Sequence, residues 1–154
     1  EYARVRTTAR PPERANPSDA GLDLFFNPEP QGFLPSPTVD AIIVKPGESK
    51  LLPTGLRFGV PHGYMLEIKN RSGVASKRSL IVGACVVDSG YDGEVFINLH
   101  NVGNDQQVVE PGDKIAQAVM IPVENPEIEE ITEDDVYGSE TERGDGGFGS
   151  TGIF

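Results

Sequence analysis

Hydrophobic and polar residues alternate along short stretches of this chain, and turn-forming residues separate these stretches. The alternation is clearest over residues 64–69 and 94–100; in the second, Val95, Ile97 and Leu99 share one face. Further candidate strands span residues 39–44, 56–60, 83–87 and 115–123. Gly, Pro, Asp and Asn fill the intervals between them. Short strands at this regular spacing predict an all-β fold, either a sandwich or a jelly roll.

Helix-forming stretches are scarce. Thirteen prolines and eighteen glycines interrupt the chain, and only residues 71–79 could form a short helix of two turns. Residues 124–135 are strongly acidic, and we interpret them as a solvated edge strand and loop. From Gly138 onward the chain has too few apolar residues to pack by itself. The pattern therefore predicts one domain over residues 1–137 and a mobile C-terminal arm over residues 138–154.

Charge and composition exclude several classes of function. The net charge is −11, and residues 122–154, with ten acids and one arginine, supply −9 of it. This charge disfavours non-specific binding to nucleic acid, whose phosphates need a basic face. No apolar run approaches the roughly 20 residues of a membrane helix. Cys85 is the single cysteine, which excludes an internal disulfide and fits a reducing compartment. We expect a cytoplasmic protein (or a nuclear one in a eukaryote) that is not secreted and binds neither nucleic acid nor membrane.

The segment RGDGGFGSTG, residues 143–152, combines groups that suit a nucleoside polyphosphate. Arg143 can clamp a phosphate, glycines let backbone N–H groups approach an anion, and Phe148 can stack on a base. The glycine spacing resembles a phosphate-binding P-loop, but Ser150 stands where that motif needs lysine, so we reject a P-loop. A flexible tail without a role remains an alternative, whereas the RGD tripeptide is weak support for cell adhesion.

Two internal turns carry further candidate groups. Arg71 and Ser72 fall where a strand ends and the short helix would begin, so they could form an anion site there. The alternative is a surface turn with a capping serine. In the segment 87–94, Asp88 could act as a general base toward water and Tyr91 offers a ring on the same turn. The alternative there is an ordinary Asp/Gly turn.

Two polar residues lie within apolar strands. Asp23, between Leu22 and Leu24, either faces solvent or has a partner such as a metal-bound water. Gln117 needs hydrogen bonds from a phosphate oxygen or from neighbouring backbone. The two histidines and Cys85 lack the spacing of a zinc site, and we expect both histidines to be structural.

Taken together, five segments resemble the trimeric deoxyuridine triphosphatases (dUTP diphosphatases). They are AGLDL (20–24), RSGVA (71–75), VVDSGYDGE (86–94), PGDKIAQ (111–117) and RGDGGFGSTG (143–152). The resemblance implies a β jelly roll that assembles as a homotrimer with shared active sites, where the arm of one subunit closes a site built by the others. It also implies Mg²⁺-dependent cleavage of dUTP to dUMP and pyrophosphate, which limits uracil in DNA and supplies dUMP for thymidylate synthesis.

The resemblance also implies residue roles. Asp88 would activate the water that attacks the α-phosphorus, and Tyr91 would pack on the deoxyribose and exclude a 2′-hydroxyl. The uracil site would comprise the backbone of Cys85, Val86 and Val87, the side chain of Phe96, and Phe148 stacked on the base. Phosphate contacts would come from Arg71, Ser72, Gly73 and Gln117, and, in the arm, from Arg143, Ser150 and Thr151. Gly149 of the arm would also bind substrate. Asp23 would hold a magnesium-bound water.

The sequence departs from the common family pattern at four positions, namely Cys85, Gly90, Asp92 and Lys114. Two other functions stay open. A relative of the dCTP deaminases would need a glutamate base, for which Glu94 lies nearby. A non-catalytic binding or regulatory protein could use the same fold, and the long, proline-rich loop 27–40 is a candidate surface for a protein partner, although harmless loop variation is favoured.

Overall fold

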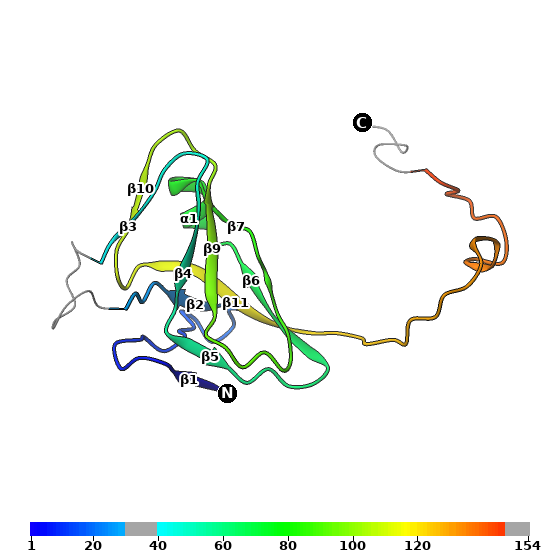
Figure 1. The fold of residues 1–154 in the computed structure, drawn as a ribbon, viewed down its shortest axis with the longest axis horizontal. Coiled ribbons are helices and arrows are strands. Elements are labelled where there is room, and N and C mark those ends of the chain that lie inside the picture. Colours follow the sequence, from blue (N-terminus) through cyan, green and yellow to red (C-terminus); the bar gives the residue numbers. More distant parts are fainter. Residues whose placement is uncertain (30–39, 147–154) are drawn as a thin grey trace. The chain divides into compact units, whose positions relative to one another are not determined.

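The computed structural model describes residues 1–29 and 40–146. The chain divides into two compact units, Glu1–Glu124 and Asn125–Phe154. The strands of the described chain all belong to the first unit (Figure 1). The boundary that we expected after residue 137 stays a prediction.

The first unit consists of short strands and one helix. The strands are β1 (Tyr2–Arg4), β2 (Leu22–Phe25), β3 (Ile42–Val44), β4 (Ser49–Pro53), β5 (Leu56–Phe58), β6 (Tyr64–Lys69), β7 (Leu80–Val82), β8 (Val86–Val87), β9 (Phe96–Asn101), β10 (Gln107–Val109) and β11 (Lys114–Pro122). The helix α1 (Ser72–Arg78) lies between β6 and β7. This content confirms the predicted all-β class with one short helix.

The strands pair antiparallel in four sets. One sheet has the order β2-β11-β6-β8 and a second the order β4-β9-β7. In addition, β1 pairs with β5 and β3 with β10 (Figure 1). β8 therefore lies at an edge of its sheet, and β6 is its only partner among the described strands. This edge position matters below, because an edge strand keeps backbone groups free on one side.

The core follows the alternation of the sequence. Val95, Ile97 and Leu99 are all buried, as predicted, and the intervening Phe96 is half exposed. Leu52 of β4 pairs with Ile97 across the sheet and is also fully buried. Full burial of an aliphatic side chain of this size contributes about 1.5–3 kcal/mol. The core thus fixes β9 and the turn before it, which carries the candidate catalytic groups.

The second unit contains no strand within its described residues, 125–146. Our prediction of an edge strand in the acidic stretch was wrong: only a short 3-10 helix forms there, η1 (Glu133–Asp135). Pro126 removes a backbone donor, and the like charges of Glu127, Glu129 and Glu130 repel one another. In the described chain no helix is long and apolar enough to cross a membrane.

Candidate active site

Asp88 and Tyr91 lie on one tight turn directly after β8. The Tyr91 N–H donates a hydrogen bond to the Asp88 carbonyl at 3.2 Å, which closes the turn. Gly90 between them has φ of +115°, a conformation that side chains disfavour. The glycine at this position thus suits the turn that presents the Asp88 carboxylate and the Tyr91 ring together.

This turn borders a hollow of about 210 Å³, here termed the hairpin hollow, and the hollow is lined by Val86, Val87, Asp88, Tyr91, Glu94, Val95 and Phe96. The rings of Tyr91 and Phe96 are half exposed, so the hollow has aromatic walls that are open to solvent. Asp88 is exposed. The structure therefore brings together Val86, Val87, Asp88, Tyr91 and Phe96, which were singled out from the sequence.

Cys85 immediately precedes the hairpin hollow but does not line it. Its carbonyl accepts a hydrogen bond from the Ile68 N–H at 2.7 Å, which fixes the backbone beside β8. Its thiol is exposed and free. A reagent in solution can therefore reach a sulfur next to the edge strand.

Glu94 also lines the hairpin hollow, and its hydrogen bonds there could not be predicted from the sequence. Its carboxylate accepts hydrogen bonds from the Gly55 N–H at 2.7 Å and from both terminal nitrogens of Arg6. Its backbone carbonyl accepts a hydrogen bond from the Tyr91 hydroxyl at 2.8 Å. The only signal in the sequence was the proximity of Glu94 to the turn, and its partner Arg6 lies 88 residues away.

A second hollow, of about 400 Å³ and here termed the phosphate hollow, is lined by Ala15, Asp19, Ala20, Gly21, Asp23, Arg71, Ser72, Gly73, Gln117 and Val119. It unites all four residues for which phosphate contacts were predicted outside the arm, together with Asp23. Arg71 is the residue before the first turn of α1, and no side chain caps this helix. The alternative of a capping serine is therefore wrong.

Asp23 is buried in β2 and bound by two cations. Arg71 Nε lies 2.7 Å from one carboxylate oxygen and Lys114 Nζ lies 2.7 Å from the other. Burial alone would raise the pKa of Asp23, but the hydrogen bonds from Lys114 and Arg71 outweigh it and hold this pKa below its ordinary value. Of the two alternatives for Asp23, the structure excludes a solvent-facing carboxylate and gives it partners, which are cationic side chains.

The side-chain amide of Gln117 forms a hydrogen bond with the backbone. Its Nε2 donates a hydrogen bond to the Asn70 carbonyl at 2.8 Å. Gly21 makes room for the amide, because a Cβ at Gly21 would lie 2.1 Å from Gln117 Oε1. The amide is therefore held at the phosphate hollow from two sides.

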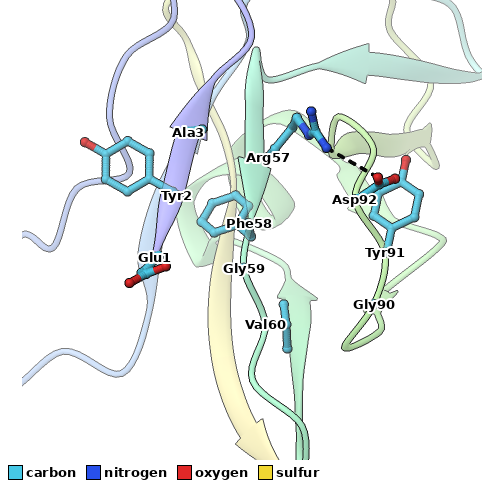
Figure 2. A pocket seen from close by; sticks show the side chains of 10 residues that line it. All are labelled: Glu1, Tyr2, Ala3, Arg57, Phe58, Gly59, Val60, Gly90, Tyr91 and Asp92. Carbon is cyan, nitrogen blue, oxygen red and sulfur yellow. Dashed lines mark ion pairs between the residues drawn. The ribbon is translucent and has the colours of Figure 1, made fainter.

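A third hollow, of about 480 Å³, lies between β1, β5 and the turn 90–92 (Figure 2). Tyr91 lines this hollow as well as the hairpin hollow. Arg57 of β5 and Asp92 of the turn form an ion pair across it, with 3.5 Å between Nη2 and Oδ2 (Figure 2). Both side chains are largely exposed, so this pair contributes little stability.

Comparisons with known proteins identify the family of this chain. The profile of the dUTPase family matches residues 7–152. The chain belongs to the dUTPase family. It is 36% identical over 152 residues to the deoxyuridine 5'-triphosphate nucleotidohydrolase of Syntrophotalea carbinolica, a match that covers 97% of this chain and 94% of that protein.

Solved structures of phage dUTPases share the fold. A variant of the Staphylococcus bacteriophage 80alpha dUTPase with bound dUpNHpp superimposes with a TM-score of 0.79 at 26% identity, over 99% of this chain and 98% of the other. A variant of the dUTPase from phage phi11 of S. aureus, which coordinates a structural Mg(II) ion, gives a TM-score of 0.73 at 25% identity, over 86% and 96% of the two chains. The predicted dUTPase-like jelly roll is thereby confirmed.

Part of the predicted dUTPase site lies in the second unit. Arg143 is described, and its Nε donates a hydrogen bond to the Gly146 carbonyl at 3.0 Å. Phe148, Gly149, Ser150 and Thr151 lie outside the described residues, as does most of the loop 27–40. Their expected contacts with substrate and partners stay predictions.

This dUTPase does not build a metal cage from the residues in the described ranges. Within residues 1–29 and 40–146, no three His, Cys, Asp or Glu side chains group as metal ligands. Mg²⁺ is commonly bound by one or two carboxylates together with substrate phosphates and water. The phosphate hollow has two acids in its lining, Asp19 and Asp23, and both oxygens of Asp23 are paired with Arg71 and Lys114. These residues therefore fit only a Mg²⁺ that would be held mainly by substrate phosphates and water.

Proposed function

We propose that this chain hydrolyses dUTP to dUMP and pyrophosphate, with Asp88 activating the attacking water and attack falling on the α-phosphorus. The observation that carries the proposal is the hairpin hollow, where Asp88, Tyr91 and Phe96 meet beside the edge strand β8. In this one hollow, a carboxylate can accept a proton, an aromatic ring can pack on a sugar, and free backbone groups can hydrogen-bond to a base. Membership of the dUTPase family supports the same reaction.

Base selection would come from backbone rather than from side chains. Val86 and Val87 form the edge strand, whose outer side can pair with the donor and acceptor groups of uracil. Cytosine presents the opposite pattern, and an unpaired buried polar group costs about 1–3 kcal/mol. The methyl group of thymine would clash in a narrow hairpin. Tyr91, packed on the deoxyribose, would leave no room for a 2′-hydroxyl.

Arg71 is arranged to bind phosphate and Asp23 at once. Its Nε and Nη2 face the Asp23 carboxylate at 2.7 and 3.5 Å. Nη1 has no hydrogen-bond partner in the part of the chain that the structure describes. Since Asp23 orients the guanidinium, this nitrogen can donate to a phosphate oxygen without the loss of the ion pair. Ser72, Gly73 and Gln117 add polar groups around the same hollow.

We further propose that the complete site requires more than one subunit. The hairpin hollow and the phosphate hollow share no lining residue, whereas a nucleoside triphosphate needs a base site and a phosphate site together. In a homotrimer, one subunit would supply the hairpin hollow and a neighbour the phosphate hollow. The arm of the third would then close over the substrate with Arg143, Phe148, Gly149, Ser150 and Thr151.

The reaction requires one proton transfer at the hairpin hollow. Asp88 accepts the proton from water as the new P–O bond forms, and pyrophosphate leaves in line. Magnesium, when bound to the triphosphate, neutralises charge and orients the phosphates. Asp23 would hold a water of that metal, and the arm would exclude bulk water. The product dUMP would feed thymidylate synthesis in the cytoplasm, or in the nucleus of a eukaryote.

The two alternatives can be separated from this function by assay. A deaminase would need Glu94 as a base, but both of its carboxylate oxygens accept hydrogen bonds from Arg6, and one also accepts from the Gly55 N–H. We therefore expect pyrophosphate from dUTP and no ammonia from dCTP. Ammonia release from dCTP would support the deaminase, and no turnover of either nucleotide would support a non-catalytic binding protein. A partner bound through loop 27–40 would be lost from a pull-down when that loop is shortened.

A further inference from the structure

A largely buried polar cluster links the N-terminal segment to the backbone of the turn that carries Tyr91. Its members are Arg6, Asn27, Gly55 and Glu94. The side chains of Arg6 and Glu94 are only 13% and 12% exposed. None of the predicted substrate contacts involves Arg6, which lies outside the five family motifs.

Arg6 has a partner for each of its guanidinium nitrogens. Nη1 donates to Glu94 Oε2 at 2.9 Å, and Nη2 donates to Glu94 Oε1 and to the Asn27 carbonyl at 2.7 Å. Nε donates to Asn27 Oδ1 at 2.9 Å. Parallel hydrogen bonds of this kind fix the angle of the carboxylate as well as its position. Glu94 is therefore held in one orientation.

Gly55 completes this cluster. Its N–H donates to Glu94 Oε1 at 2.7 Å, and its φ of +71° lies in the left-handed region. A Cβ at Gly55 would lie 2.4 Å from Asn27 Oδ1, so only glycine allows this approach. The backbone between β4 and β5 thus adds a third group that holds the Glu94 carboxylate.

The Tyr91 ring depends on Glu94 for its placement. Half of Tyr91 is exposed, and its hydroxyl donates to the Glu94 carbonyl at 2.8 Å. A Cβ at Gly93 would lie 2.5 Å from the Tyr91 hydroxyl oxygen, so the ring lies close against the backbone before Glu94. A shift of the Glu94 main chain would therefore move the ring.

We propose that Arg6 is a positioning residue for sugar selection: by fixing Glu94, it holds the Tyr91 ring where a 2′-hydroxyl cannot fit. This inference rests on the proposed role of Tyr91 in packing on the deoxyribose. Removal of Arg6 leaves a mostly buried carboxylate without its cation, and such a group moves toward water. The Glu94 carbonyl then moves with its side chain, and the wall against ribose loosens.

The ion pair between Arg57 and Asp92 provides a matched control. It also joins an arginine to an acid of the same turn, but it is exposed and involves neither Tyr91 nor Glu94 (Figure 2). Loss of that pair should leave the Tyr91 ring in place. Arg57→Ala therefore tests whether any broken ion pair at this turn alters selection.

The experiment measures kcat and KM for dUTP and for UTP in the full-length wild type, Arg6→Ala, Arg6→Lys, Arg57→Ala, Tyr91→Phe and the double variant Arg6→Ala/Tyr91→Phe. Thermal unfolding shows which variants are folded.

We expect Arg6→Ala to lower the ratio of kcat/KM for dUTP over UTP by about threefold to tenfold, the effect of losing one well-placed hydrogen bond. Arg57→Ala should keep the wild-type ratio. Arg6→Ala should add little to Tyr91→Phe, because both break the same link.

The results distinguish a role of Arg6 in positioning Tyr91 from a role in stabilising the fold alone. If folded Arg6→Ala loses kcat/KM equally for both nucleotides and keeps the ratio, the inference is overturned. Arg6→Lys keeps the positive charge and should show a smaller change in the same direction; it decides the matter if Arg6→Ala does not fold. A wild type that hydrolyses dUTP and UTP equally, or neither, would instead overturn the proposed function.

Discussion

The Asp23 carboxylate and the Arg71 guanidinium, 48 residues apart in the chain, form an ion pair with 2.7 Å between Oδ1 and Nε. Lys114 reaches the other carboxylate oxygen from β11. One buried acid thereby joins β2, β11 and the residue before α1. The same acid orients Arg71 at the phosphate hollow, where we propose that the phosphates bind. Asp23 would therefore contribute both to the stability of the fold and to phosphate binding.

This pair predicts how stability depends on pH. Because the folded state lowers the pKa of Asp23, the stabilisation is present above the ordinary value of 3.8 and is lost as the pH falls through the folded value. Asp23→Asn should lower the free energy of unfolding by about 1–2 kcal/mol at neutral pH, after allowance for the partial exposure of both cations. Denaturant unfolding at several pH values measures this difference, which should shrink in acid.

An exposed ion pair nearby provides the control for that measurement. Glu13 pairs with Arg10, and both side chains are well exposed. Glu13→Gln should change the free energy of unfolding little at any pH. A difference for Asp23→Asn that stayed constant down to strong acid would show that the charge of Asp23 is not what stabilises the fold.

Asp88→Asn tests the proposed general base. The amide cannot accept the proton from water, so kcat should fall by about 10²- to 10⁴-fold, while the nucleotide still binds. Pyrophosphate release measures the rate, and calorimetric titration with dUTP measures binding. Asp92→Asn, an exposed acid on the same turn, should retain most of the activity. A wild-type rate in Asp88→Asn would remove Asp88 from the mechanism.

A chain that ends at Glu142 tests the arm. The unit Glu1–Glu124 forms its own compact body, so the shortened chain should keep the circular dichroism spectrum and the mass in solution of the full-length chain. Its kcat/KM for dUTP should fall by about 10- to 100-fold, because the arm would no longer position substrate or exclude water. A chain that ends at Gly152 serves as the control and should remain active. If both chains matched the full-length rate, residues 143–152 would have no part in catalysis.

The single cysteine offers a chemical test of the base site. Cys85 is exposed beside the edge strand β8, so iodoacetamide should modify it and raise KM for dUTP by crowding the uracil. Bound dUMP should slow the modification, and mass spectrometry gives its extent. Cys85→Ser, compared with its own untreated rate, should resist the reagent. Full activity after complete modification would place the base away from Cys85.

The sequence predicted the regular parts of the fold because alternation is a local property. The strand over 64–69 and the buried face of Val95, Ile97 and Leu99 formed as expected. The strand β4 was missed because Lys50 and Pro53 interrupt its pattern, and only pairing with β9 specifies it. The short strands β1, β7 and β10 depend in the same way on distant partners.

The site residues that lie within family motifs could be predicted from the sequence. The contacts between side chains far apart in the sequence could not. Asp88, Tyr91 and Phe96 could be named from one hairpin. The pairing of Asp23 with Arg71 and Lys114 could not, since a polar residue in an apolar strand signals a partner without its identity. Arg6 gave no signal, because its contacts with Glu94 and Asn27 arise only in the folded chain.

The central claim is that the chain is a dUTP diphosphatase, and pyrophosphate release from dUTP, dCTP, dTTP and UTP, each with and without Mg²⁺, tests it most directly. We expect rapid release from dUTP with Mg²⁺ and much slower release after removal of the metal by chelation. For dCTP, kcat/KM should be lower by at least about tenfold, the effect of one unpaired buried polar group. For dTTP and UTP it should also be much lower, because the thymine methyl group and the 2′-hydroxyl would clash with the site. Equal release from all four nucleotides, or none from dUTP, would contradict the account.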